Sequence, residues 1–328
     1  MAVPVLIVVL LLFSSAVSAS AATVSGELPV PYGWFGVENA AETVFGNVTK
    51  GLFGRPEASP PGSNDWGCRP SAEHPNPVVL VHGYGMNQSI SWPTIAPLLK
   101  NNGYCVYSLT YGNQAWPDIP VVNQVGGRDR MEDSAKKLGS FVDRVLEQTA
   151  AKKVDIVGHS EGSLMPDYYV KFLDGRSKVA RHVAMAPLWR GSDLAGLGNL
   201  YGFFKWLGVS PMVDAAFSVA GLGGAVPEFA STSNFIKKLN QNSPAVPDVQ
   251  YTSIITKAMS GFPVSPWQSG VLEGGNANNV VLQDVCPADN TGHSTLLFDP
   301  NVAQIIVNAL DPGSAKKVQC QQTHLPPF

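Results

Sequence analysis

The sequence lacks any run of five like charges, and only 14% of its 328 residues are charged. Its formal net charge of −3 leaves no basic footprint of the kind that binds nucleic acid, so we exclude a nucleic-acid partner. No C-x-x-C pair and no closely spaced pair of histidines suggests zinc, and we therefore predict no metal site. With 45% hydrophobic residues, the chain is able to bury the core of one large domain or two small ones.

Charge is also missing from the first 26 residues. They contain the ten-residue apolar run PVLIVVLLLF, which is too short to span a bilayer because a spanning helix needs about 20 residues. Small residues follow the run, and Ala19 and Ala21 suit cleavage after Ala21. The usual Lys or Arg before the apolar run is absent. We interpret residues 1–21 as a secretory signal peptide and predict a secreted, extracellular protein.

Cysteine is scarce, with four residues in the chain. An even number in an exported protein indicates two disulfides, and the sequence alone permits three pairings. The four are Cys68, Cys105, Cys286 and Cys320. Two sites, Asn47 and Asn87, match the N-glycosylation sequon, a short pattern that also arises by chance.

The order of the expected elements indicates an α/β fold. Residues 22–76 are rich in Gly, Pro and Asn and predict an irregular N-terminal arm, followed by one domain over 77–328. Strands are expected at 77–82, 104–112, 154–157, 182–186, 249–255 and 280–283. Helices are expected at 95–101, at 129–149, after Ser160 to about residue 172, and from Asp299-Pro300 onward. Strands that alternate with helices favour a mostly parallel sheet covered on both faces. The apolar, Gly-rich segment 188–245 breaks the alternation and predicts a helical cap or lid, with ordinary packing against the sheet as the alternative.

The stretch VDIVGHSEGSLMP, residues 154–166, carries the clearest chemical pattern. A buried strand runs into G-x-S-x-G, the turn that exposes a nucleophilic serine above the sheet of a hydrolase. Gly158 and Gly162 flank Ser160, where strand and helix approach too closely for larger side chains. We predict that Ser160 is the catalytic nucleophile.

An oxyanion hole needs two backbone N–H groups, one after the nucleophile and one from an earlier strand–helix loop. The N–H of Glu161 is the first candidate. The N–H of Tyr84 in the sequence HGYG is the second, because Gly83 and Gly85 allow close approach. The alternative is that HGYG is only a turn between a strand and a loop.

The base is expected after the last strand, because this fold orders its catalytic residues as Ser, acid, His. His293 follows the last predicted strand by ten residues and precedes the last helix. The other histidines precede or lie outside that region, occupy the variable position of the elbow, or lie in the C-terminal tail. They are His74, His82, His159, His182 and His324. We predict that His293 is the base, against the alternative of a surface-loop histidine.

Several motifs together resemble a known family: HPNPVVLVHGYG, GYCVYSLTYG, VDIVGHSEG, VQYTSI and VVLQDVCPADNTGH, in this order. From about Asn64 to Cys320 the chain resembles the secreted actinobacterial triacylglycerol lipases and is similar to the fungal lipase B enzymes. The resemblance implies an α/β-hydrolase fold, carboxylic-ester substrates and no cofactor. It also implies two disulfides, Cys68–Cys105 and Cys286–Cys320.

The resemblance fails at the catalytic acid. In these lipases an Asp follows the strand that here reads VQYTSII, and its expected place falls between Met259 and Gly261. No acidic residue occurs between Asp248 and Glu273. A carboxylate from elsewhere is the first explanation; the candidates in order are Asp284, Asp289 and Asp193. An impaired hydrolase, and a hydrolase fold kept for binding apolar ligands, are the others.

The sequence thus predicts a secreted, monomeric serine hydrolase that cleaves carboxylic esters of lipids through an acyl-enzyme. Its partners are a lipid or other ester substrate and, transiently, a lipid surface. The alternatives are a non-catalytic lipid-binding protein and an acyltransferase that uses the same Ser160 and His293.

Overall fold

The structure is a computed structural model that describes residues 26–40, 58–113, 125–192, 223–258, 267–323 and 325. Several predicted features lie outside these residues: the signal peptide, the sequon at Asn47, Asp193, most of the predicted cap, and the place of the missing acid at 259–261.

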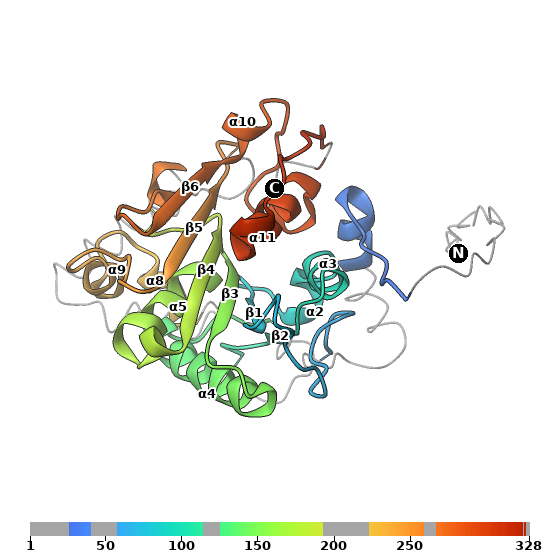
Figure 1. The fold of residues 1–328 in the computed structure, drawn as a ribbon. Coiled ribbons are helices and arrows are strands. Elements are labelled where there is room, and N and C mark those ends of the chain that lie inside the picture. Colours follow the sequence, from blue (N-terminus) through green and yellow to red (C-terminus); the bar gives the residue numbers. More distant parts are fainter. Residues whose placement is uncertain are drawn as a thin grey trace, which may run out of the picture.

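A six-stranded parallel sheet forms the centre of the molecule (Figure 1). Its order is β2-β1-β3-β4-β5-β6. β2 lies on one side of β1, β3 lies on the other side, and β4, β5 and β6 follow β3 in sequence order. The strands are β1 (Val78–Val81), β2 (Val106–Leu109), β3 (Val154–His159), β4 (Val179–Met185), β5 (Gln250–Ile255) and β6 (Ala277–Val281). β1, β2 and β3 are buried along their whole length, as continuous apolar strands covered on both faces should be.

Helices cover both faces of the sheet (Figure 1). One apolar cluster joins the sheet to α4 (Met131–Thr149) and α5 (Glu161–Phe172), and the other joins it to α3 (Ile95–Asn101) and α11 (Pro300–Leu310). The short helices are α2 (Gln88–Ser91), α8 (Ala225–Glu228), α9 (Asn234–Leu239) and α10 (Leu282–Val285), and the 3-10 turns are η2 (Gly175–Ser177), η4 (Trp267–Gly270), η5 (Thr295–Phe298) and η6 (Pro312–Ser314). This is the predicted three-layer α/β architecture.

Two helices show how local sequence sets their ends. In α4, Leu138, Val142 and Val145 are fully buried, so the predicted apolar face points to the core. α11 begins at Pro300, and the Asp299 carboxylate accepts the backbone N–H groups of Asn301 and Val302 at 2.7 and 2.9 Å. Asp at the N-cap followed by Pro is the expected start signal.

The last strand differs from its prediction. β6 spans Ala277–Val281, and Leu282 and Gln283 begin the short helix α10 instead of continuing the strand. The Gln283 amide donates to the Thr256 hydroxyl at 3.1 Å and to the Asp289 carbonyl at 2.9 Å, and these bonds turn the chain away from the sheet. The apolar pattern of VVLQ does not reveal such distant partners.

Both disulfides implied by the resemblance are present. Cys68–Cys105 ties the segment before β1 to the start of β2, and Cys286–Cys320 ties the loop after α10 to the C-terminal tail. Of the predicted cap, residues 223–245 contain α8 and α9, and α9 packs against α5.

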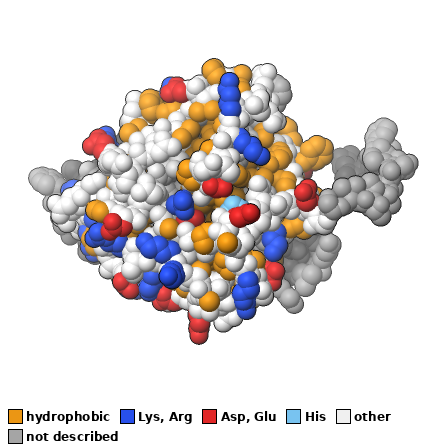
Figure 2. Space-filling view, viewed as in Figure 1, with side chains coloured by type: hydrophobic (Ala, Val, Ile, Leu, Met, Phe, Trp, Pro, Cys, Tyr) orange, Lys and Arg blue, Asp and Glu red, His pale blue; other side chains and the backbone are white. Residues whose placement is uncertain are grey.

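The surface carries charge of both signs. On the face seen in Figure 2, Lys and Arg side chains lie among Asp and Glu side chains. Among the described residues, no helix has the length and apolar character needed to cross a membrane.

Candidate active site

Ser160 occupies a strained turn between β3 and α5. Its backbone angles are φ 55° and ψ −117°, in a region that residues with side chains rarely adopt. Its N–H donates to the Met185 carbonyl on β4 at 2.9 Å, and its own carbonyl accepts the Ser163 N–H at 2.9 Å. Neighbouring elements therefore fix the turn on both sides, at the carboxyl end of the central strand.

Glycine at two positions makes this turn sterically feasible. A Cβ on Gly158 would lie 1.8 Å from the Gly162 carbonyl oxygen, and a Cβ on Gly162 would lie 2.1 Å from the Val81 carbonyl oxygen. Backbone atoms cannot give way as a flexible side chain does, so both glycines are required. These contacts explain why the first and last positions of the G-x-S-x-G pattern are glycine in this protein.

His293 is held against the elbow by its backbone. The Nε2 of His159, the residue before Ser160, lies 2.8 Å from the His293 carbonyl oxygen, and the two imidazole rings are 5.1 Å apart. A carbonyl only accepts, so His159 is the tautomer with its proton on Nε2. The predicted nucleophile and the predicted base thus belong to segments that touch, although they are distant in sequence.

Both histidines are uncharged at neutral pH. Burial lowers the pKa of His159 from 6.5 to about 4. Burial and the neighbouring His159 lower the pKa of His293 from 6.5 to about 3. A neutral imidazole has a lone pair with which to take a proton, as a general base requires.

The two predicted oxyanion donors lie on neighbouring segments. Glu161 is the first residue of α5, so its N–H has no acceptor within its own helix. We call residues 82–86 the HG turn; it is bound to the segment before α4 by hydrogen bonds from Gly85 N–H to the Gly126 carbonyl (2.9 Å) and from Gly126 N–H to the Met86 carbonyl (2.8 Å). A Cβ on Gly83 would lie 3.2 Å from the Ser160 Cβ, so the turn passes directly beside the serine.

Two candidates for the missing acid have other partners. Asp284 lies on α10 with its side chain 63% exposed and forms an ion pair with Lys257 at 2.6 Å. Asp289 is fully buried and accepts hydrogen bonds from the Thr291 N–H, the Asn301 amide and the Thr323 hydroxyl at 2.8–3.0 Å.

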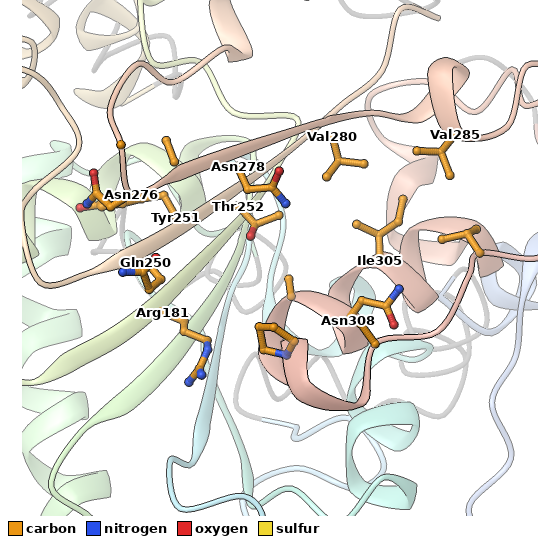
Figure 3. A pocket seen from close by; sticks show the side chains of 16 residues that line it. Arg181, Gln250, Tyr251, Thr252, Asn276, Asn278, Val280, Val285, Ile305 and Asn308 are labelled. Carbon is orange, nitrogen blue, oxygen red and sulfur yellow. The ribbon is translucent and has the colours of Figure 1, made fainter.

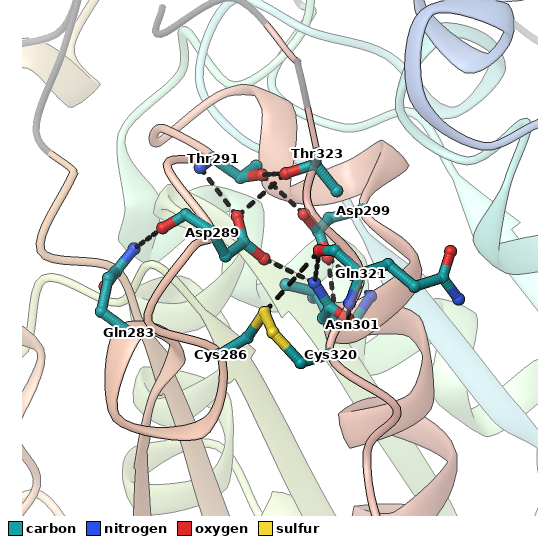
Figure 4. The surroundings of a disulfide bond; sticks show 10 residues. Gln283, Cys286, Asp289, Thr291, Asp299, Asn301, Cys320, Gln321 and Thr323 are labelled. Atoms are coloured by element: carbon teal, nitrogen blue, oxygen red, sulfur yellow. Dashed lines mark hydrogen bonds between the residues drawn. A yellow bond between two sulfur atoms is a disulfide. The ribbon is translucent and has the colours of Figure 1, made fainter.

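Asp289 belongs to a buried polar network that supports the loop before His293 (Figure 4). The Thr291 hydroxyl donates to Asp299 at 2.6 Å, and the Thr291 carbonyl accepts the Thr256 hydroxyl at 2.7 Å. Burial and the negative charge of Asp289 raise the pKa of Asp299 from 3.8 to about 6. The network and the Cys286–Cys320 disulfide fix this loop from β5, α11 and the C-terminal tail.

A groove of about 510 Å³ lies away from Ser160, between β5, β6 and α11 (Figure 3). Arg181 and several Asn and Gln side chains lie toward one end, and Val280, Val285 and Ile305 toward the other. Neither Ser160 nor His293 lines it. Among the described residues, no three His, Cys, Asp or Glu side chains are grouped closely enough to hold a metal ion.

Comparison with known proteins places the chain in a family. The profile of the lipases of class 2 matches residues 75–305, more than half of the sequence, including the HG turn, the elbow and His293. The chain belongs to the class 2 lipase family.

A solved lipase structure shares the α/β-hydrolase fold of this class 2 lipase family member. Lipase B of Aspergillus fumigatus superimposes with a TM-score of 0.57 at 16% identity, over 80% of this chain and 57% of that protein. The present chain therefore spans little more than half the length of that lipase. The mature form of the Bacillus licheniformis lipase BlEst2 gives a TM-score of 0.49 at 14% identity, over 74% of this chain and 94% of that one.

Sequence patterns missed two residues of this site. The G-x-S-x-G pattern gives His159 no role beyond the variable position of the elbow, yet its ring hydrogen-bonds the segment that carries the predicted base. The same pattern predicts a role only for the backbone N–H of Glu161, yet the Glu161 side chain is fully buried beside the HG turn. A polar residue within a run that is otherwise buried was the available signal for both.

Proposed function

We propose that this class 2 lipase family member is a secreted serine hydrolase that cleaves carboxylic esters of lipids, with Ser160 as nucleophile and His293 as base. The observation that carries the proposal is the contact between His159 and His293, because it brings the segment of a neutral, buried histidine to the strained serine. The two disulfides fit an oxidising compartment outside the cytoplasm.

The reaction follows from these roles. His293 takes the hydroxyl proton of Ser160 as the serine oxygen attacks the ester carbonyl, and the N–H groups of Tyr84 and Glu161 stabilise the oxyanion. Collapse of this intermediate breaks the bond to the alcohol, which leaves with the proton from His293. Water then attacks the acyl-enzyme, His293 accepts its proton and returns it to Ser160, and the carboxylic acid is released. Removing one oxyanion donor costs about 10²–10³ in turnover in a known serine protease.

Two other functions remain in competition. A non-catalytic lipid-binding protein is favoured by the residues at the acid position, Met259 to Gly261, none of which carries a negative charge. Disabling the acid costs about 10⁴ in turnover in a serine protease, while the other groups keep partial catalysis. Acyl transfer to an alcohol uses the same residues, with the alcohol in place of water.

Labelling with a fluorophosphonate ester tests the proposal. The folded protein should gain one adduct, mapped by mass spectrometry to Ser160, and the control Ser160→Ala should gain none. Hydrolysis of emulsified long-chain and soluble short-chain esters then separates a lipase from an esterase, and an added alcohol reveals transfer. Absence of an adduct on folded protein, together with binding of apolar ligands, would establish the non-catalytic alternative.

A further inference from the structure

Glu161, next to the nucleophile, carries a carboxyl group in an unusual position. Its side chain is fully buried. A Cβ on Gly127 would lie 2.8 Å from the Glu161 Oε2 and 2.8 Å from the Tyr84 Cα. The carboxyl group therefore lies against Gly127, at the point where that residue meets the HG turn, with no room for a larger residue between them.

This carboxyl group receives no hydrogen bond from the described residues: neither oxygen has a donor there. An ionised carboxylate needs donors on both oxygens, and without them its burial costs several kcal/mol. Charged carboxylates are almost never fully buried unless paired. A buried carboxyl group without donors is far better accommodated in its protonated form.

Tyr111 does not supply the missing donor. Its hydroxyl donates its single proton to the His82 carbonyl at 2.6 Å. A hydrogen bond from this hydroxyl to Glu161 would lower the pKa of the carboxyl group, but burial and the neighbouring negative charges outweigh that effect.

The negatively charged groups around Glu161 also favour its protonated form. Burial and the negative charges of Glu228 on α8 and Asp129 before α4 raise the pKa of Glu161 well above its ordinary value. The remaining titratable neighbours are His82, which burial keeps neutral with a pKa of about 4, and Tyr84 and Tyr111, whose pKa values are raised by burial.

Two arginines flank the site, but both have other partners. The Arg128 Nε donates to the Val125 carbonyl at 2.9 Å. Arg130 forms ion pairs with Glu132 at 3.2 Å and with Glu228 at 3.1 Å.

We propose that Glu161 is a positioning residue that works in its protonated, uncharged form, packing beneath the HG turn and fixing it beside Ser160, and that loss of this proton at alkaline pH disables the oxyanion site. The inference rests on the proposed serine hydrolase function. A carboxylate at this position would repel both Glu228 and the negative charge that develops on the ester oxygen. Like charges at such short range oppose each other strongly in a low-dielectric interior.

The pH profile of kcat and KM tests this role. Wild-type kcat should fall toward alkaline pH, and Glu161→Gln, which is isosteric and cannot ionise, should not show this alkaline fall, whatever its kcat at neutral pH. Glu161→Ala should lower kcat about 10- to 100-fold below the wild-type value at neutral pH, with little change in KM and no alkaline fall, because it removes support from one oxyanion donor. An unchanged alkaline fall in Glu161→Gln would overturn the proposal.

Glu228→Gln is the matched control. It removes a neighbouring negative charge but leaves Glu161 able to ionise, so the alkaline fall should persist and move to lower pH. If the fall disappears in Glu228→Gln and persists in Glu161→Gln, the titrating group is Glu228 and the proposal is wrong.

Thermal unfolding gives a readout independent of catalysis. A carboxyl group that keeps its proton in the fold and releases it on unfolding costs stability as pH rises above its ordinary value of 4.5. The melting temperature of Glu161→Gln should therefore exceed that of the wild type by a margin that grows with pH. A margin that does not vary with pH would refute the protonated state of Glu161. This test is independent of the serine hydrolase proposal, because it applies even if Ser160 takes no fluorophosphonate.

Discussion

His159 and His182 provide a matched pair of buried histidines on adjacent strands, one in contact with the proposed site and one without such a contact. They are 2% and 0% exposed. His159 donates to the His293 carbonyl at 2.8 Å, whereas neither ring nitrogen of His182 has a hydrogen-bond partner among the described residues. Leucine is apolar and of similar size, so His159→Leu and His182→Leu are comparable perturbations.

The two substitutions should have opposite effects near neutral pH. His159→Leu leaves the buried His293 carbonyl without its donor, a loss of about 1–3 kcal/mol in the free energy of unfolding. The segment that carries the proposed base then shifts, and a displacement of about 1 Å near the reacting groups costs about 100-fold in rate. His182→Leu removes two buried, unpaired nitrogens, so stability should stay the same or increase while kcat/KM is unchanged.

At acid pH the expected effects on stability change sign for His159. Its pKa falls from 6.5 when unfolded to about 4 in the fold, and that of His182 falls to about 3. A lowered histidine pKa gives stability that is complete above 6.5 and is lost as pH falls toward the folded value. The full losses are about 3 kcal/mol for His159 and about 5 kcal/mol for His182. Each leucine variant escapes its own loss, so both should resist acid better than the wild type.

Urea denaturation at a series of pH values, with kcat/KM on a soluble ester, measures both quantities. His182→Leu should unfold at lower pH than the wild type and keep its activity. The positioning role of His159 is refuted if His159→Leu loses stability as expected but keeps wild-type kcat/KM. Equal loss of activity in the two variants would assign the effect to general damage of the sheet.

Two further predictions concern buried carboxylates. Asp167 accepts the Tyr251 hydroxyl at 2.7 Å, and burial raises its pKa from 3.8 to about 7. The wild type therefore loses about 4 kcal/mol of stability as pH rises between these values. In denaturant melts, the free energy of unfolding of Asp167→Asn should match that of the wild type in acid and exceed it above neutral pH. Asp299→Ala removes the cap of α11 and the acceptor for Thr291. It should therefore lower the free energy of unfolding by about 2 kcal/mol and slow fluorophosphonate labelling of Ser160. Asp299→Asn still caps the helix and should retain most of the stability and most of the labelling rate.

Local sequence signals predicted the elements whose ends are set locally. α3 and α11 begin where the pattern and the Asp299-Pro300 pair indicate, and α4 ends at the predicted residue. Both disulfide pairings, by contrast, came from the resemblance to known lipases rather than from spacing. Strand ends agree less well with their predictions: β2 is shorter than expected, β4 begins earlier, and β6 ends at Val281. In the last case Gln283 finds hydrogen-bond partners that no periodicity encodes.

The parts of the site that sequence did not reveal depend on long-range contacts. The bond from His159 to His293 joins residues 134 positions apart, and the burial of Glu161 requires Gly127 and the HG turn to close around it. Composition gives no indication of either. The missing acid is a different matter: its expected place at 259–261 lies outside the described residues, and a local pattern was sufficient to show that no carboxylate is encoded there.

The ionisable groups beside Ser160 share one property, an uncharged state at neutral pH. Burial keeps His82, His159 and His293 unprotonated, and it keeps Glu161 protonated. The proposed reaction creates two charges there, an oxyanion and an imidazolium, and in a low-dielectric setting each would respond strongly to any fixed charge nearby. A neutral surrounding leaves the two new charges to stabilise each other and the backbone N–H groups to stabilise the oxyanion. The burial that lowers the pKa of His293 also disfavours the imidazolium that the reaction forms, so a carboxylate beside His293 would speed the reaction. A carboxylate at Glu161, adjacent to the proposed nucleophile, would instead oppose the oxyanion, which is why Glu161 is acceptable there only in its protonated form.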